Sequence, residues 1–264
     1  MPNDAYNEPA VALPTASMPL LGFGTWQIED ADAPAAVSSA LEAGYRHIDT
    51  ATGYANERGV GRAVAESGLD RDEVFITTKL PPEHGGRERQ TISESLDKLG
   101  VDQLDLWLVH WPPNGEATPA VWEQVIAAQQ DGLTKAIGVS NYSLAQIDEL
   151  IDATGVTPSV NQVRWSPAEY DVAFAQGLAE RGVVLEGYSP FKASNLQDPT
   201  FLRIAEAHDA DAAQVIVAWH IAHEFVVIPK SSQPERIRSN ARGVTFQLTE
   251  DEVAAIDALG GTAR

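Results

Sequence analysis

Four residues carry side chains suited to moving a proton and polarising a carbonyl group, and each stands at or just after the end of a short apolar run. Asp49 and Tyr54 occur in DTATGY, Lys79 ends VFITTK, and His110 ends LDLWLVH. If the three runs are successive strands of a parallel barrel, their last residues meet at one end of that barrel. The spacing therefore predicts a single proton-transfer site.

These residue types fit the reduction of a carbonyl group. Hydride arrival at the carbonyl carbon leaves negative charge on oxygen, so a site needs a proton donor and a group that polarises the oxygen. A free tyrosine has a pKa of about 10, and an ammonium beside Tyr54 would draw that pKa toward neutrality. Lys79 is the candidate cation, Asp49 would keep it protonated, and His110 would donate a hydrogen bond to the carbonyl oxygen.

Each residue also has an ordinary explanation when it is taken alone. A tyrosine after a strand is typical of packing, and a single histidine is often structural. Lys79 fits a surface charge or the Schiff-base amine of an aldolase-type barrel equally well. Convergence of all four on one barrel end favours the catalytic interpretation.

Length and composition indicate an unexported globular protein. The chain has 264 residues with 44% hydrophobic content, close to the about 250 residues of one α/β barrel, so we expect a single domain over residues 1–264. It shows no leader pattern and no apolar run of about 18 residues, which predicts a cytoplasmic protein without a membrane span. The absence of cysteine removes disulfides and thiolate chemistry.

The charge balance is strongly acidic, with 38 acidic against 18 basic residues and a formal net charge of −20. Such a surface repels phosphate backbones and argues against nucleic acid as a partner. A solvated surface is the ordinary explanation. Only five of the basic residues are lysine, which also fits a high-salt cytoplasm, where repulsion is screened within about 3 Å at molar salt, or a GC-rich genome that replaces lysine by arginine.

Short β-branched runs alternate with longer amphipathic runs, as in βα units around a parallel sheet. The expected strands are 20–25, 47–49, 74–79, 104–110, 136–140, 159–162, 184–188 and 226–229. The expected helices are 33–43, 57–67, 87–99, 119–131, 144–153, 173–181, 234–241 and 250–259, and a helical region is expected at 200–222. Pro14 and Pro19 suggest a hairpin before the first strand. The predicted fold class is α/β, a (β/α)8 TIM barrel with an N-terminal hairpin and C-terminal extra helices.

Seven segments resemble the aldo-keto reductase family in order and spacing. They are GFGTW at 22–26, GYRHIDTATGYANERGVG at 44–61, the TTK ending at Lys79, DQLDLWLVHWP at 102–112, GVSN at 138–141, YSP at 188–190 and IPKS at 228–231. The resemblance implies a (β/α)8 barrel that uses NADPH without a Rossmann domain. The family's catalytic residues then fall on Asp49, Tyr54, Lys79 and His110.

The same resemblance implies a set of cofactor-binding residues. Those at the nicotinamide end are Ser140, Asn141, Gln162, Tyr188 and Ser189, with Tyr188 as the aromatic residue stacked on the ring. Those at the adenosine 2′-phosphate and adenine are Lys230, Ser231, Arg236 and Asn240. Two cations facing a phosphate favour NADP over NAD.

Substrate contacts are implied for two further aromatic residues. Trp26 and Trp111 match pocket walls of the family and join Tyr54 and His110 as implied substrate-binding residues. Apolar walls discriminate poorly between similar carbon skeletons. The short segment after YSP resembles the compact prokaryotic members related to 2,5-diketo-D-gluconate reductases and predicts an open pocket.

Three positions depart from the family pattern. Arg164 and Ser166 stand where the family usually has an acidic residue and a histidine, which puts the loop structure there in question. Ser239 replaces the usual glutamate before the adenine-side asparagine, a change expected to weaken the grip on adenine. His220 and His223 have a spacing that a metal could use, but with no cysteine and no third ligand we expect no metal site.

The residues and the resemblance together predict a monomeric NADPH-dependent reductase of small aldehydes or ketones, with dicarbonyls, keto sugars and aromatic aldehydes as candidate classes. Neither nucleic acid nor membrane is an expected partner. One alternative is an NADPH-binding sensor or regulatory protein of the same fold with negligible turnover. A lysine-dependent aldolase that uses Lys79 is the other, and it would not require NADPH.

Overall fold

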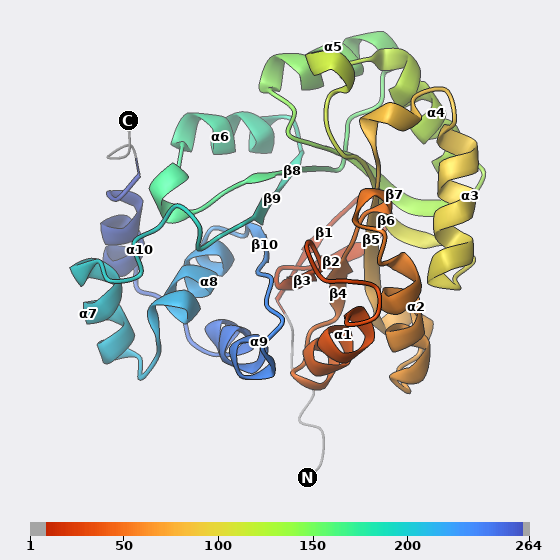
Figure 1. Cartoon of the computed structure of the whole chain (residues 1–264). Helices are drawn as coiled ribbons and strands as arrows, with labels where there is room; N and C mark the ends of the chain where they lie inside the picture. The colour runs from red at the N-terminus through yellow and green to blue at the C-terminus, as the bar shows by residue number, and fades with distance from the viewer. Residues whose placement is uncertain (1–8, 261–264) are drawn as a thin grey trace.

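The computed structural model describes residues 9–260, and its centre is a ring of parallel strands surrounded by helices (Figure 1). Eight strands, β3 to β10, pair in sequence order. The ring closes where the last strand meets the first: Leu21 bridges Val227, and the Gly24 N–H donates to the Pro229 carbonyl at 3.2 Å. The expected (β/α)8 barrel is confirmed.

The bounds of the elements follow the expected alternation. The strands are β1 (Ala10–Ala12), β2 (Ser17–Pro19), β3 (Gly22–Gly24), β4 (His47–Asp49), β5 (Phe75–Leu80), β6 (Leu104–Val109), β7 (Thr134–Ser140), β8 (Val160–Arg164), β9 (Val184–Tyr188) and β10 (Val226–Ile228). The helices are α1 (Ala33–Glu42), α2 (Glu57–Glu66), α3 (Glu88–Leu99), α4 (Pro119–Gln130), α5 (Leu144–Thr154), α6 (Val172–Glu180), α7 (Pro199–Ala207), α8 (Ala212–Ala222), α9 (Pro234–Ala241) and α10 (Glu250–Asp257). The expected C-terminal extra helices are α9 and α10.

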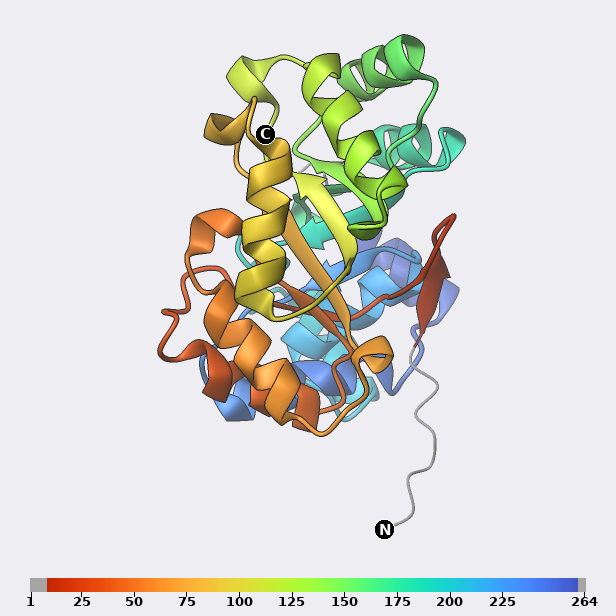
Figure 2. The ribbon, with the colours of Figure 1, turned by 90° about the vertical axis from the view of Figure 1, so that its right-hand side faces the viewer.

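The hairpin β1–β2 lies at one end of the barrel (Figure 2). Met18 is fully buried, and the Thr15 hydroxyl donates to the carbonyl of Lys135 at the start of β7 at 2.5 Å. Met18 belongs to an apolar cluster that fills the barrel at the N-terminal ends of the strands. The buried residues of this apolar cluster are Leu13, Met18, Leu20, Phe75, Leu106, Leu108, Ala136, Val160 and Val226. The hairpin therefore seals the end of the barrel where the strands begin.

Local sequence signals explain where the helices begin, end and pack. Ser143 begins α5 and Thr249 begins α10 with reciprocal side-chain to backbone caps, and Gly100 ends α3 in the left-handed conformation at φ 67°, as capping rules predict. Gly61 in the GVG segment lies against the Leu99 carbonyl, with no room for a Cβ. That glycine pattern serves helix packing.

The expected helical region 200–222 consists of two helices, because the chain breaks between α7 and α8. Asp209 adopts φ 50° in the connection. Asp211 then caps α8 by accepting a hydrogen bond from the Gln214 N–H, and the Gln214 side chain accepts one from the Asp211 N–H. An aspartate three residues before a glutamine is a helix-start signal, so a new helix begins there. In the described part of the chain, no helix has both the length and the apolarity to cross a membrane.

Candidate active site

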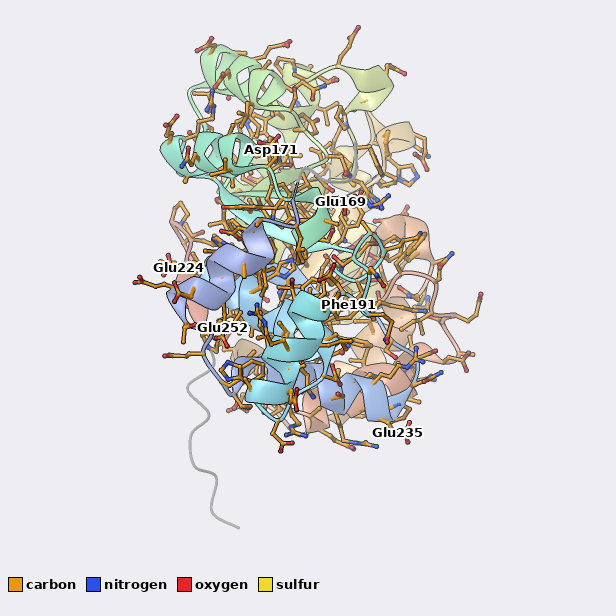
Figure 3. The ribbon with its side chains drawn as sticks, turned by 90° about the vertical axis from the view of Figure 1, so that its left-hand side faces the viewer. Glu169, Asp171, Phe191, Glu224, Glu235 and Glu252 are labelled. Carbon is orange, nitrogen blue, oxygen red and sulfur yellow. The ribbon has the colours of Figure 1, made fainter. Side chains whose placement is uncertain are left out.

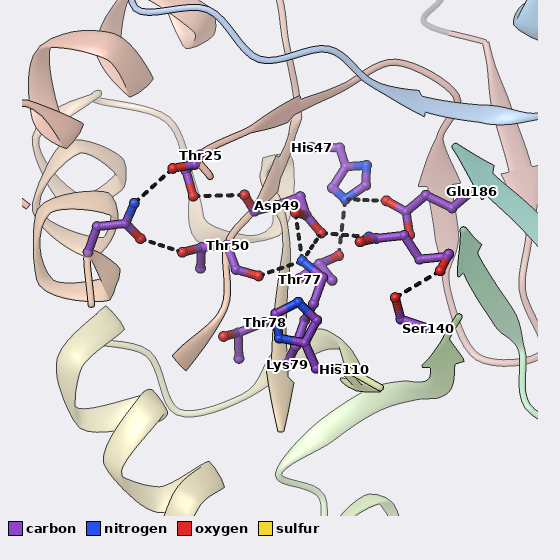
Figure 4. A network of polar contacts seen from close by, with 12 residues as sticks. Thr25, His47, Asp49, Thr50, Thr77, Thr78, Lys79, His110, Ser140 and Glu186 are labelled. Atoms are coloured by element: carbon purple, nitrogen blue, oxygen red, sulfur yellow. Dashed lines mark hydrogen bonds and ion pairs between the residues drawn. The ribbon is translucent and has the colours of Figure 1, made fainter. Parts of the chain in front are cut away.

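The side chain of Lys79 lies inside the barrel near the C-terminal ends of the strands, fully buried on β5 (Figure 4). Its Nζ donates hydrogen bonds to Asp49 Oδ1 and Oδ2, each at 2.7 Å, and to the Thr50 carbonyl at 2.8 Å. Strands β4 and β5 pair with Asp49 opposite Thr77, and this register brings the carboxylate beside the lysine. All three N–H groups of the ammonium therefore have acceptors.

Burial and pairing act against each other in this ion pair. Burial opposes the charge on Lys79, but the carboxylate of Asp49 and the nearby Tyr54 outweigh it and raise the pKa of Lys79 above its ordinary value. Burial also raises the pKa of Asp49, while Lys79 and the amide of Gln162 pull it back. The two side chains thus depend on each other, because either charge alone would be costly in this interior.

Tyr54 lies on the short 3-10 helix Thr52–Tyr54 that follows β4, with its ring centroid 5.2 Å from Lys79 Nζ. Burial raises the pKa of the Tyr54 hydroxyl and Lys79 opposes that effect, so the net direction is upward. The expectation that Lys79 brings the Tyr54 pKa down toward neutrality is wrong for the protein alone, because desolvation of the phenolate is the larger effect. The hydroxyl therefore keeps its proton.

His110 comes directly after β6, and its ring centroid is 5.6 Å from that of Tyr54 in an edge-on arrangement. Burial, and the nearby Lys79 charge, lower the pKa of His110 to about 3. The imidazole is therefore neutral and offers one N–H as a donor. A neutral donor beside a protonated tyrosine can polarise a carbonyl oxygen that Tyr54 then protonates.

Four of the five residues implied for the nicotinamide end, all but Ser189, form one hydrogen-bonded chain, in which Asn141 donates to Ser140 Oγ at 2.9 Å. Gln162 on β8 donates to Asp49 Oδ2 at 2.8 Å and so joins this group to the catalytic residues. Ser140 donates to the Gln162 carbonyl at 2.8 Å, Asn141 donates to the carbonyl of His110 at 3.2 Å, and Tyr188 donates to Asn141 Oδ1 at 2.9 Å. Strands β7, β8 and β9 thus present these side chains at the same barrel end.

Two of the residues implied for the nicotinamide end adopt a backbone conformation that is costly for any residue other than glycine. Asn141 and Ser189 follow β7 and β9 directly, with φ of 65° and 57°. Left-handed backbone of this kind is held in place by its surroundings and gathers at functional sites. The chain bends sharply at the barrel mouth in both places and directs its polar groups there.

A cavity of about 700 Å³ holds the residues implied for the 2′-phosphate and adenine. Lys230, Ser231, Arg236 and Asn240 all line it. Neither Lys230 nor Arg236 forms an ion pair with a residue in the range 9–260, and both side chains are exposed. In so acidic a chain, two cations without acidic partners on one cavity wall suit an anion.

The three departures from the family pattern find local partners. Arg164 Nε lies 2.7 Å from Glu169 Oε1, and the Ser166 hydroxyl donates to Glu169 Oε2 at 2.8 Å. Ser239 donates to the carboxylate of Asp211 at 2.7 Å, and Asp211 lines the cavity. Ser239, which replaces the family's usual glutamate, is therefore bonded to an acidic residue at the start of α8.

The two implied pocket walls are open to solvent. The exposed fractions of Trp26 and Trp111 are 46% and 48%. Trp26 follows Thr25, whose hydroxyl donates to the Asp49 carbonyl at 3.0 Å, and Trp111 follows His110. Lys192 Nζ lies 5.6 Å from the Trp26 ring centroid, which places a cation beside one wall. Figure 3 labels Phe191, which precedes Lys192, and the exposed acidic residues Glu224 and Glu235 on the same side of the molecule.

Sequence reasoning missed one buried carboxyl group in the interior. Glu186 on β9 is fully buried and lies 3.8 Å from His47 Nε2. His47, expected to share a strand face with Asp49 and to serve packing or hydrogen bonding, is within hydrogen-bonding distance of Thr77 Oγ1 at 3.0 Å. A charged residue in the middle of the apolar run 184–188 is the signal that could have found Glu186.

Each of the two histidines with metal-compatible spacing has a hydrogen-bonding partner nearby, one within α8 and one on α10. His220 Nδ1 lies 2.7 Å from the Ile216 carbonyl, and His223 Nε2 lies 2.9 Å from Asp257 Oδ1 on α10. Among the residues that the structure describes, no three histidine, aspartate or glutamate side chains are grouped to hold a metal ion.

Comparison with known proteins gives a consistent result. Residues 20–260 match the model of the Aldo/keto reductase family. An aldo-keto reductase of Mycolicibacterium vanbaalenii is 41% identical over 95% of this chain and 93% of its own length. The methylglyoxal reductase DkgA of Salmonella typhimurium is 40% identical over 92% of this chain and 90% of its own length.

Solved structures agree with the sequence matches. An aldo/keto reductase from Brucella melitensis superposes with a TM-score of 0.92 at 40% identity, covering 95% of this chain and 97% of that one. The Bombyx mori aldo-keto reductase AKR2E4, solved in complex with NADP, gives a TM-score of 0.87 at 30% identity, covering 97% of this chain and 94% of that one.

Proposed function

The chain belongs to the aldo/keto reductase family, a family of oxidoreductases, and on that premise we propose that it is an NADPH-dependent reductase of small aldehydes and ketones with Tyr54 as the proton donor. One observation carries the proposal. Asp49, Lys79, Tyr54 and His110 come from strands β4 and β5 and from the segments that follow β4 and β6, and they lie in direct contact or ring contact at one barrel end. That end is where barrel enzymes do their chemistry.

The donor set fits NADP(H) as cofactor. Lys230 and Arg236 supply two exposed cations and Ser231 a hydroxyl to one cavity, a combination that suits a phosphate monoester. Asn141 and Gln162 supply amides, and Tyr188 an aromatic ring, beside the catalytic residues. The relative solved with NADP supports the same choice.

NADPH, when bound, supplies the hydride that reduces the carbonyl carbon. The neutral imidazole of His110 donates a hydrogen bond to the carbonyl oxygen and orients it. Tyr54 transfers its hydroxyl proton to that oxygen as negative charge develops there. The ammonium of Lys79 stabilises the phenolate that Tyr54 becomes, while Asp49 and the Thr50 carbonyl hold the ammonium in place.

Small dicarbonyl compounds are the first substrate class to test. The methylglyoxal reductase DkgA covers nearly the whole chain at 40% identity. Trp26 and Trp111 each leave about half of their surface open, so the pocket offers apolar walls without tight enclosure. Walls of this kind accept related carbon skeletons with little discrimination.

The deciding experiment follows NADPH oxidation with methylglyoxal, a keto sugar acid and an aromatic aldehyde, in parallel with NADH and at both low and molar salt. We expect turnover that prefers NADPH and ranks the three classes. NADPH binding without turnover on any carbonyl would favour the sensor instead. Borohydride trapping of a substrate adduct on Lys79, with no need for NADPH, would favour the aldolase.

A further inference from the structure

Glu186 is a buried acid in the barrel interior that the four catalytic residues leave without a role. It pairs in register with Gln162 of β8 and Val226 of β10, and its side chain is fully buried. Figure 4 shows it facing His47, whose Nε2 lies 3.8 Å from Glu186 Oε1. Neither carboxyl oxygen makes a hydrogen bond of ordinary geometry with a described residue.

We propose that Glu186 is a positioning residue that keeps its proton in the resting enzyme, so that the barrel interior beside Tyr54 carries one negative charge, that of Asp49, opposite one positive charge, that of Lys79. The proposal rests on the proposed function, because it assigns Glu186 an effect on proton transfer from Tyr54. Loss of the Glu186 proton adds a second negative charge to the interior and slows catalysis.

The hydrogen-bond inventory around Glu186 supports a neutral side chain. The three donors of Lys79 go to the two oxygens of Asp49 and to the Thr50 carbonyl, and the amide of Gln162 donates a hydrogen bond to Asp49 Oδ2. Neither oxygen of Glu186 accepts a hydrogen bond of ordinary geometry from these groups, although the amide of Gln162 lies near enough to lower the pKa of Glu186. A buried carboxylate without donors is far more costly than a buried carboxylic acid.

The charged and titratable groups that face Glu186 act in the same direction. Burial first, and then the charge of Asp49, raise the pKa of Glu186 to about 8, while Gln162 and Lys79 oppose this. From β4, His47 brings no positive charge at neutral pH, because burial lowers its pKa to about 3. On the other side, β10 contributes only apolar residues, Val226–Ile228.

Ionised Glu186 would act on Tyr54 at a distance. Its negative charge raises the pKa of Tyr54 and of Lys79. A higher Tyr54 pKa disfavours the phenolate that forms as the proton is transferred, so the rate falls. His110 has a pKa of about 3 and Tyr54 one above its ordinary value, so neither accounts for a titration near pH 8.

The test compares the pH dependence of kcat, at saturating NADPH and carbonyl substrate, for the wild type, Glu186→Gln and Glu57→Gln. Glu57 is a matched control, because it is equally buried but bonds Thr78 and Lys98 in place of the catalytic residues. Between about pH 7 and about pH 9.5 we expect kcat of the wild type and of Glu57→Gln to fall about tenfold, as one added charge predicts. Glu186→Gln should fall less than about twofold.

A fall in kcat at alkaline pH that is as large in Glu186→Gln as in the wild type would overturn the proposal. Glu186→Asp, which keeps a titratable carboxyl, should retain the loss with a shifted midpoint. If Glu186→Gln does not fold, Glu186→Leu takes its place, since a neutral apolar side chain suits the buried position.

A second readout needs no activity. Unfolded glutamate has a pKa of about 4.3, below the folded value of about 8. Folded Glu186 therefore binds more protons than unfolded Glu186 between these values, and stability falls as pH rises through about 8. The melting temperature of the wild type should fall relative to Glu186→Gln between about pH 5 and pH 8.5, and a constant difference would contradict the proposal. If the melting temperature of the wild type falls relative to Glu186→Gln but the wild type reduces no carbonyl compound, the proposed function is refuted and the protonation of Glu186 stands.

Discussion

Along strand β5, Phe75 and Lys79 are four residues apart and both contribute to the barrel interior, yet their surroundings differ in every respect. Phe75 packs in the apolar cluster with Leu106 and with Met18 of the hairpin. Lys79 makes three hydrogen bonds to Asp49 and to the Thr50 carbonyl. The same strand thus begins in a sealed core and ends in a charged site.

This contrast shows how a buried charge is held in place. The N-terminal end of the barrel contributes stability through apolar packing and needs no particular polar geometry. The C-terminal end contains a lysine that is fully buried, which is tolerable only because every donor is satisfied. Changes at the first end should affect folding alone, whereas loss of either charge at the second end should affect both folding and chemistry.

Removing the cation should give the largest effect. Lys79→Met leaves the Asp49 carboxylate buried and unpaired, so we expect the free energy of unfolding in urea to fall by about 3 to 5 kcal/mol. Carbonyl reduction should be lost as well, because the Tyr54 phenolate loses its counter-charge. The double variant Lys79→Met with Asp49→Asn should recover most of the stability and none of the activity. A single variant as stable as the wild type would show that the pair is not mutually dependent.

Opening a cavity at the sealed end should separate stability from activity. Met18→Ala removes a fully buried side chain from the apolar cluster and should lower the free energy of unfolding by about 2 to 4 kcal/mol. The kcat below the unfolding transition should stay within about twofold, because no catalytic contact changes. Met18→Leu, which nearly conserves volume, should cost less than about 1.5 kcal/mol. A large drop in kcat for Met18→Ala would mean that the two ends are coupled.

A smaller effect should follow at the cavity beside the charged end. Arg236→Ala removes one of the two cavity-lining cations without an acidic partner and should weaken NADPH binding about tenfold or more, while NADH binding stays nearly unchanged. Arg238 on the same helix is a matched control, since it is exposed, does not line the cavity and pairs with Glu235 at 3.8 Å. Equal losses for both cofactors would place the 2′-phosphate elsewhere.

The comparison also explains what could be predicted from the sequence. The apolar runs of β5 and β6 are fully buried on both faces, so the runs and their spacing are enough to predict the barrel. Asp49, Lys79 and His110 stand at strand ends, and parallel strands bring those ends together. Pro14 and Pro19 are enough to predict the hairpin.

Other features depend on tertiary geometry that the amino-acid sequence alone does not show. A strand that is buried on both faces lacks the alternation of apolar and polar residues that marks its two faces. The sequence VVLEGY at 183–188 therefore does not reveal that Glu186 faces His47. The direction of the Tyr54 pKa depends on the balance between burial and Lys79, and burial follows only from the folded chain. The partners of Arg164 and Ser166 are on Glu169, five and three residues further on, in a loop whose path the family pattern did not give.

The most direct test of the central claim is the Tyr54→Phe variant, assayed with NADPH and the best carbonyl substrate of the wild type. The phenyl ring keeps the ring contacts with His110 and Lys79 and loses only the hydroxyl group, so NADPH affinity and thermal stability should be nearly unchanged. We expect kcat to fall by at least about 100-fold, the low end for loss of a general acid. Turnover within about twofold of the wild type, in a variant that still binds NADPH, would contradict the assignment of Tyr54 as the proton donor.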